Sequence, residues 1–148
     1  MESRKKLSIC PDKWGGDLWK LLHFIATQYE PRKKNEFRRF FTEIVGSILP
    51  CNKCSVNYKY HLNKNPIRLD SKEELMSWLF EIHNMTNTLL KKRKLTKTQF
   101  KNIDWVKKDI SCSFERYTLL VQMELRGSDD VVFQMAFSQF LSFIMNHI

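Results

Sequence analysis

The sequence predicts an all-α protein: a bundle of four or five helices with an extra helical segment at the C-terminus. Apolar residues recur at the three- and four-residue spacing of a helix along most of the chain. No segment of useful length alternates with the two-residue period of a strand, and only four glycines and four prolines are present to interrupt helices. At 148 residues, the chain is long enough for one domain with a buried core.

The first two predicted helices span residues 17–29 and 35–49, and Pro31 separates them. Each has an apolar stripe on one face, so we expect each to contribute that face to the core. The first stripe consists of Leu18, Leu21, Leu22, Ile25 and Tyr29, and the second of Phe37, Phe40, Phe41, Ile44, Val45 and Ile48.

A third helix is predicted to begin at the Cys-Xaa-Xaa-Cys motif of Cys51 and Cys54 and to run to about Asn63. Pro50 breaks the preceding pattern, and proline is favoured at or just before a helix start. Pro66 ends the segment, because the residue before a proline is disfavoured in the helical conformation.

Two capping boxes mark the next helix starts. Ser71 and Glu74 open a long helix, and Thr96 and Gln99 open a shorter one that runs to about Lys108. In a capping box, the two side chains satisfy backbone amides that the first helical turn leaves unpaired.

Residues 107–148 are also helical by period, with a break at residues 127–129. We expect the apolar stripe of the last helix to pack on the rest of the chain or on a second subunit, since an exposed apolar face of that size promotes aggregation. The stripe consists of Phe133, Ala136, Phe137, Phe140 and Ile144.

The chain is basic, with 25 lysines and arginines against 16 acidic residues and a net charge of +9. This balance favours an anionic partner such as nucleic acid, an anionic membrane or a phosphate-bearing cofactor, without choosing among them. Residues 1–13 lack the apolar core of a signal peptide, and no apolar stretch is long enough to span a membrane. We therefore expect a protein made in the cytosol that does not associate with a membrane.

Four cysteines are too few for a disulfide-stapled secreted scaffold, and two of them form the motif at the third helix. A helix start stabilises a thiolate, which suits a pair that exchanges disulfides with a substrate. The same motif is half of a zinc site, which His61 or His83 and a third cysteine would complete. Thioredoxin-like chemistry is less favoured, because its βαβ context is absent.

The surroundings of the motif favour a redox role. Aromatic, imidazole and amide side chains precede it in WGGDLWKLLH and follow it in HNMTN, and lysines come after. Such groups stack on a planar heteroaromatic cofactor, bond to its edges and neutralise its phosphates. Each of these residues taken singly is better explained by core packing.

These motifs, in this order, resemble the Erv/ALR sulfhydryl oxidase family: Trp14-Gly15 to His23, Tyr29, Leu49-Pro50 before the cysteine pair, and His83-Asn84 to Lys92. The resemblance runs from Trp14 to Trp105. It implies a helical bundle that binds FAD, usually as a homodimer. It also implies an FAD-binding oxidase domain over residues 1–106 and an extension over residues 107–148.

The resemblance assigns roles by motif position. Cys54 would lie against the isoalloxazine ring and Cys51 would exchange with the substrate. The remaining residues implied to bind FAD are Trp14, Gly15, Gly16, Trp19, His23, Tyr29, His83, Asn84, Asn87, Leu90, Lys91 and Lys94. No metal site is expected.

The implied reaction oxidises a protein dithiol, possible carriers including thioredoxin-like proteins, and passes the electrons to O₂ to give H₂O₂. A structural disulfide found in cellular members is missing, because no cysteine lies near Phe80. In this respect the chain resembles the compact members of large DNA viruses. The expected location is the host cytoplasm or virion for a viral protein, and the mitochondrial intermembrane space for a cellular one.

Cys10 is a candidate shuttle thiol because it is near the N-terminus, and an incidental thiol is an equal alternative. Cys112 is interpreted as incidental. Two other functions remain open: a zinc-stapled helical interaction module, and a basic nucleic-acid-binding protein that uses residues 91–94. The second lacks a groove-reading motif, so we expect no nucleic acid partner.

Overall fold

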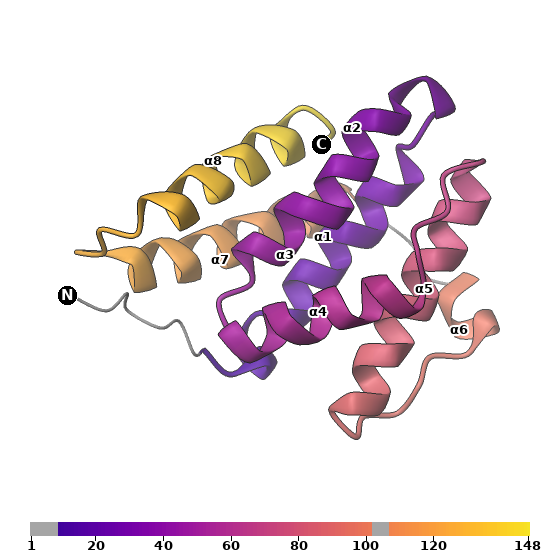
Figure 1. The fold of residues 1–148 in the computed structure, drawn as a ribbon, viewed down its shortest axis with the longest axis horizontal. Coiled ribbons are helices and arrows are strands. Elements are labelled where there is room, and N and C mark those ends of the chain that lie inside the picture. The colour runs from indigo at the N-terminus through magenta and orange to yellow at the C-terminus, as the bar shows by residue number, and fades with distance from the viewer. Residues whose placement is uncertain (1–8, 102–106) are drawn as a thin grey trace.

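The computed structural model describes residues 9–101 and 107–148 (Figure 1), and its regular elements over these residues are all helical. The predicted all-α bundle is therefore confirmed. The elements are η1 Pro11–Lys13, α1 Gly15–Thr27, η2 Pro31–Lys33, α2 Lys34–Arg39, η3 Phe40–Ile44, α3 Val45–Ile48, α4 Asn52–Lys64, α5 Lys72–Leu89, α6 Lys97–Lys101, α7 Lys107–Leu125 and α8 Val131–Met145.

The helix predicted over residues 35–49 is one rod made of α2, η3 and α3, and its middle segment is a π-helix. The wider π turn was not predicted, because the apolar pattern continues through it. The buried Tyr58 hydroxyl of α4 donates a hydrogen bond of 2.6 Å to the carbonyl of Phe41 in η3. This contact holds α4, which begins at the cysteine pair, against the rod that precedes it.

Both predicted capping boxes start helices. At α5 only half of the box forms: the Glu74 amide donates to the Ser71 hydroxyl at 3.1 Å, while the Glu74 carboxylate pairs with Arg68 at 2.8 Å. At α6 both halves form, with distances of 2.9 and 3.1 Å between Thr96 and Gln99. The predicted continuation to Lys108 falls partly on residues 102–106, which lie outside the described residues.

The two C-terminal helices belong to the same hydrophobic core as the rest of the chain. Helix α7 packs on α1, and α8 packs on α3 and η3, with the ring of Phe143 stacked on Phe40 at 4.1 Å. The α8 stripe predicted from the sequence faces this core and includes Phe140, which is fully buried. Gly127, with a φ of 76°, makes the left-handed turn between the two helices.

Figure 1 shows α7 and α8 side by side at one end of the bundle and α5 with α6 at the other. Helix α4 runs across the bundle between them, and α1 passes behind it. Among the described residues, no helix is long and apolar enough to cross a membrane.

The cysteine pair lies at the N-terminal end of α4, where α1, α3 and α5 are close neighbours.

Candidate functional site

Cys51 and Cys54 form a disulfide at the N-terminus of α4, with their Cα atoms 5.2 Å apart. Pro50 leads into an extended Cys51, which is the N-cap residue, and the Cys54 amide donates to the Cys51 sulfur at 3.2 Å. Cys51 is only 9% exposed, and Cys54 is somewhat more open. The two cysteines of the motif thus form a disulfide, with one sulfur held by a helix amide.

A cavity of about 290 Å³ lies beside this disulfide, and Cys54 is part of its wall while Cys51 is not. Residues from α1, α3, α4 and α5 line it. Among the residues predicted to bind a cofactor, those on the wall are Trp14, Gly15, Gly16, Trp19, Cys54, His83, Asn87 and Leu90. Segments far apart in the sequence therefore meet at one cavity.

One wall of the cavity consists of stacked rings. The Trp19 indole lies on the His83 imidazole, with centroids 4.0 Å apart and planes within 7°. The His83 Nδ1 shares a hydrogen bond of 2.9 Å with the Nε2 of His23, which is buried behind it against Phe100. In such a pair one ring nitrogen donates and the other accepts, so the tautomers of the two rings are linked.

Burial keeps both imidazoles neutral. Desolvation, with a smaller contribution from the charge of Lys92, lowers the pKa of His83 to about 4. Desolvation and then the neighbouring His83 hold the pKa of His23 well below its usual value. At neutral pH the wall is an uncharged aromatic surface that can stack on a flat ligand.

Five predicted cofactor residues do not line the cavity. His23 supports His83, and the Tyr29 hydroxyl donates to the Leu69 carbonyl at 2.6 Å. Asn84 bonds to both backbone groups of Leu95 at 2.8 and 2.9 Å and so braces the segment after α5. Lys91 and Lys94 are exposed. Direct cofactor contact by these five residues stays a prediction.

Ten residues on the wall were missing from the predicted set, and three of them, Asn57, Tyr58 and Lys92, show which signals were available. Asn57 and Tyr58 follow Cys54 by three and four residues, so the helical period alone places them on its face of α4. Lys92 lines the cavity because Lys91 adopts a φ of 58°, a left-handed turn that redirects the chain at the end of α5. No sequence signal marks that turn, since it occurs at a lysine rather than a glycine.

The N-terminal strap, which we define as residues 9–13, is hydrogen-bonded to Pro50 and contributes Pro11 to the cavity wall. The Ile9 amide donates to the Pro50 carbonyl at 2.9 Å, and the Trp14 indole donates to the Ile9 carbonyl at 3.0 Å. Asp12 pairs with Lys92 at 2.8 Å, and this contact lowers the pKa of Asp12. The exposed Cys10 follows Ile9, and Ile9 is hydrogen-bonded to Pro50, the residue before Cys51.

A zinc site finds no support in the described part of the chain, where no three His, Cys, Asp or Glu side chains gather as metal ligands. His61 is buried on α4, and His83 belongs to the ring stack. The basic run at residues 91–94 is interrupted by the left-handed turn and by the Lys92–Asp12 pair. These features give neither alternative function a formed site.

Residues 16–106 match the sequence model of the Erv1 / Alr family. A probable FAD-linked sulfhydryl oxidase of Acanthamoeba polyphaga mimivirus is 37% identical over 92 residues, which cover 58% of this chain and 64% of that protein. The FAD-linked sulfhydryl oxidase of Oryza sativa is 30% identical over 131 residues, covering 86% of this chain and 63% of that protein.

Among solved structures, the yeast Erv1 core is 30% identical and superposes with a TM-score of 0.57, covering 67% of this chain and 86% of that one. The chain spans just under two thirds of the length of the mimivirus and rice relatives. Because the family model covers more than half of the sequence, from α1 past α6, the chain belongs to the Erv1 / Alr family.

Proposed function

We propose that this chain is an FAD-linked sulfhydryl oxidase, which forms disulfides in protein dithiols and reduces O₂ to H₂O₂. One observation carries the proposal: the redox-active sulfur of Cys54 and the Trp19–His83 stack share the wall of one cavity. The names of the mimivirus and rice relatives describe the same activity.

The cavity has the character that FAD requires. Its volume of about 290 Å³ is at the lower end of the range of ligand pockets, about 300–1,000 Å³, and suits the ring portion of the cofactor. Trp19 and His83 offer ring faces, and Asn87 offers an amide. A Cβ added at Gly15 or Gly16 would meet nothing within 4 Å, so the backbone there is open to a ligand.

Charged groups at the cavity fit a phosphate-bearing ligand. The first turn of α1 begins at Gly15, and free amides at a helix start favour anions. Asp17 in that turn is paired with Arg116 at 2.8 Å, which offsets its negative charge. Lys92 also lines the cavity, and it is already paired with Asp12. Gly15 and Gly16 would therefore hold the phosphates.

FAD, when bound, supplies the two-electron chemistry that links thiol oxidation to O₂. The chain itself performs the thiol exchange. A substrate thiolate attacks the Cys51 sulfur, the bond to Cys54 breaks, and Cys54 leaves as a thiolate on the cavity wall. The second thiolate of the substrate then attacks the substrate sulfur that is bonded to Cys51. A disulfide forms within the substrate, and Cys51 leaves as a thiolate.

The helix start favours that last step. The Cys54 amide that donates to the Cys51 sulfur stabilises the departing thiolate, and a stabilised thiolate is a better leaving group. In the net reaction the dithiol loses two electrons and two protons, and O₂ accepts them to form H₂O₂. These contacts support Cys51 as the sulfur that meets the substrate and Cys54 as the sulfur that faces the cofactor.

Cys10 is proposed as a shuttle thiol. The strap holds it beside Pro50, and it is exposed while Cys51 is nearly buried. Replacement of Cys10 by serine should slow the oxidation of a protein dithiol and leave the oxidation of dithiothreitol unchanged. If the serine variant oxidises both substrates at the wild-type rates, Cys10 has no shuttle role.

Residues 1–106 would form the oxidase domain, since every residue on the cavity wall lies within them, and residues 107–148 would support it. The proposed partners are a protein dithiol, O₂ and a second copy of the chain. A viral origin, with action in the host cytoplasm or virion, is supported by the mimivirus relative, and the mitochondrial intermembrane space is the alternative for a cellular protein.

The test is direct. The purified protein should be yellow, with nearly one flavin per chain, and should consume O₂ and release H₂O₂ when dithiothreitol is added. A colourless preparation that contains zinc and consumes no O₂ would refute the proposal.

A further inference from the structure

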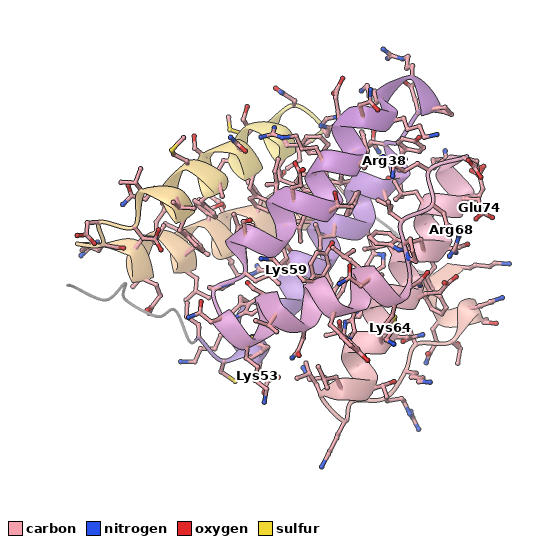
Figure 2. The ribbon with its side chains drawn as sticks, viewed as in Figure 1. Arg38, Lys53, Lys59, Lys64, Arg68 and Glu74 are labelled. Atoms are coloured by element: carbon pink, nitrogen blue, oxygen red, sulfur yellow. A yellow bond between two sulfur atoms is a disulfide. The ribbon has the colours of Figure 1, made fainter. Side chains whose placement is uncertain are left out.

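The outward side of α4 is basic and partly apolar. Five exposed residues form this surface, which we call the α4 outer face: Lys53, Val56, Lys59, Tyr60 and Lys64. Figure 2 shows the three lysines distributed along α4, with Lys53 near its start and Lys64 near its end. The same helix carries the disulfide at its N-terminus.

Helical spacing places four of these residues in a continuous stripe, with Lys59 to one side of it. Lys53, Val56, Tyr60 and Lys64 are separated by three, four and four residues, so they lie on one side of the helix. At 1.5 Å per residue, Tyr60 is about 14 Å along the helix from Cys51, and Lys64 is about 20 Å away. A partner bound along the stripe would reach the sulfur that the substrate attacks.

No residue in the described part of the chain neutralises the charge of this surface. Residues 52–64 contain no Asp or Glu, and Lys53, Lys59 and Lys64 form no ion pair with any described residue. The nearby Arg68 is different, because it pairs with both Glu74 and Glu81. The α4 outer face therefore presents free positive charge next to the active site.

Two apolar side chains interrupt the lysines. Val56 is 66% exposed and Tyr60 is 57% exposed, unlike the buried Tyr58 of the same helix. The Lys64 ammonium lies 5.5 Å from the centre of the Tyr60 ring, so the ring is set among cations. An exposed tyrosine within a charged surface is typical of a protein-binding anchor.

We propose that the α4 outer face is the docking surface for an acidic segment of the protein dithiol substrate, which it aligns so that the substrate cysteines meet Cys51. This inference rests on the proposed oxidase function. A protein partner fits better than nucleic acid, because apolar groups stand among the lysines and the adjacent disulfide exchanges with thiols, which nucleic acids lack. Glutamates and aspartates about 5–20 Å from the substrate cysteines would match the lysines.

Two synthetic peptides test the inference. Both carry one Cys-Gly-Gly-Cys dithiol, followed by a run of glutamates in one and of glutamines in the other. At low salt the wild-type holoenzyme should oxidise the glutamate peptide with a kcat/KM about tenfold higher, because complementary charge mainly accelerates association. Added salt should remove this preference.

The test variant replaces Lys53, Lys59 and Lys64 by glutamine. It should oxidise both peptides equally and keep the wild-type rate with dithiothreitol. A matched control replaces three exposed lysines on α2, α5 and α6, which removes the same charge elsewhere and should retain the preference: Lys34, Lys72 and Lys101.

Three results would overturn the inference. The first is equal oxidation of the two peptides by the wild type, and the second is a preference for the glutamate peptide that survives in the α4 variant. The third is an α4 variant that keeps the peptide preference but binds a DNA duplex more weakly than the wild type, which would make the surface a nucleic-acid site. If the wild type fails to oxidise dithiothreitol, the oxidase function itself is refuted, which is a separate outcome.

Discussion

Replacement of His83 by phenylalanine should remove much of the acid sensitivity of this protein. The native pKa of His83 is about 4, whereas an unfolded histidine has a pKa near 6.5. As the pH falls below 6.5, the unfolded chain binds a proton that the native chain rejects, so stability is lost between pH 6.5 and 4. Phenylalanine keeps a ring on Trp19 but cannot take up a proton.

The size of the effect follows from the two pKa values. One pKa unit corresponds to about 1.36 kcal/mol, so the loss for His83 is about 2 kcal/mol at pH 5 and about 3 kcal/mol at pH 4, relative to pH 7.5. The buried His23 adds to the loss in the wild type, because its pKa is also lowered.

Urea denaturation at pH 7.5 and pH 5, followed by circular dichroism, measures the difference. The variant will be less stable at pH 7.5, since its phenylalanine leaves His23 without the hydrogen bond to His83. Its additional loss between the two pH values should nevertheless be about 2 kcal/mol smaller than that of the wild type. An equal loss in both proteins would show that His83 is not a desolvated neutral base.

Two further predictions concern the core and the site. Phe140→Ala should lower the free energy of unfolding by about 3–5 kcal/mol, since the ring is fully buried, while Met135→Ala on the exposed side of α8 should change it by less than about 0.5 kcal/mol; similar losses in urea would contradict the described packing. Tyr58→Phe leaves the buried Phe41 carbonyl without its hydroxyl donor and should cost about 1–3 kcal/mol, measured in the same way, and an unchanged midpoint would show that the bond contributes nothing.

Local rules account for most of the fold. The apolar period located α1 and the rod of α2, η3 and α3, the prolines delimited α4, and the capping residues Ser71 and Thr96 located helix starts within a residue or two. These signals succeed because they depend on groups a few residues apart. The buried face of α8 was also readable, since Phe140 and its neighbours repeat with the helical period.

Features that depend on contacts between residues far apart in the chain could not be predicted from the sequence. The π turn in η3 arises where the carbonyl of Phe41 meets the Tyr58 hydroxyl, 17 residues away in sequence. The burial of Cys51 and the placement of Lys92 involve the N-terminal strap and a left-handed lysine. The sequence indicated the chemistry of the site, and long-range packing decided which residues face the cavity.

The central claim is that electrons pass from Cys54 to a flavin in the adjacent cavity. The most direct measurement is anaerobic titration of the yellow protein with dithiothreitol, followed by its visible absorbance. The wild type should bleach, while Cys54→Ser should bind the same amount of flavin and stay yellow. Bleaching of the Cys54→Ser variant at the wild-type rate would contradict the account.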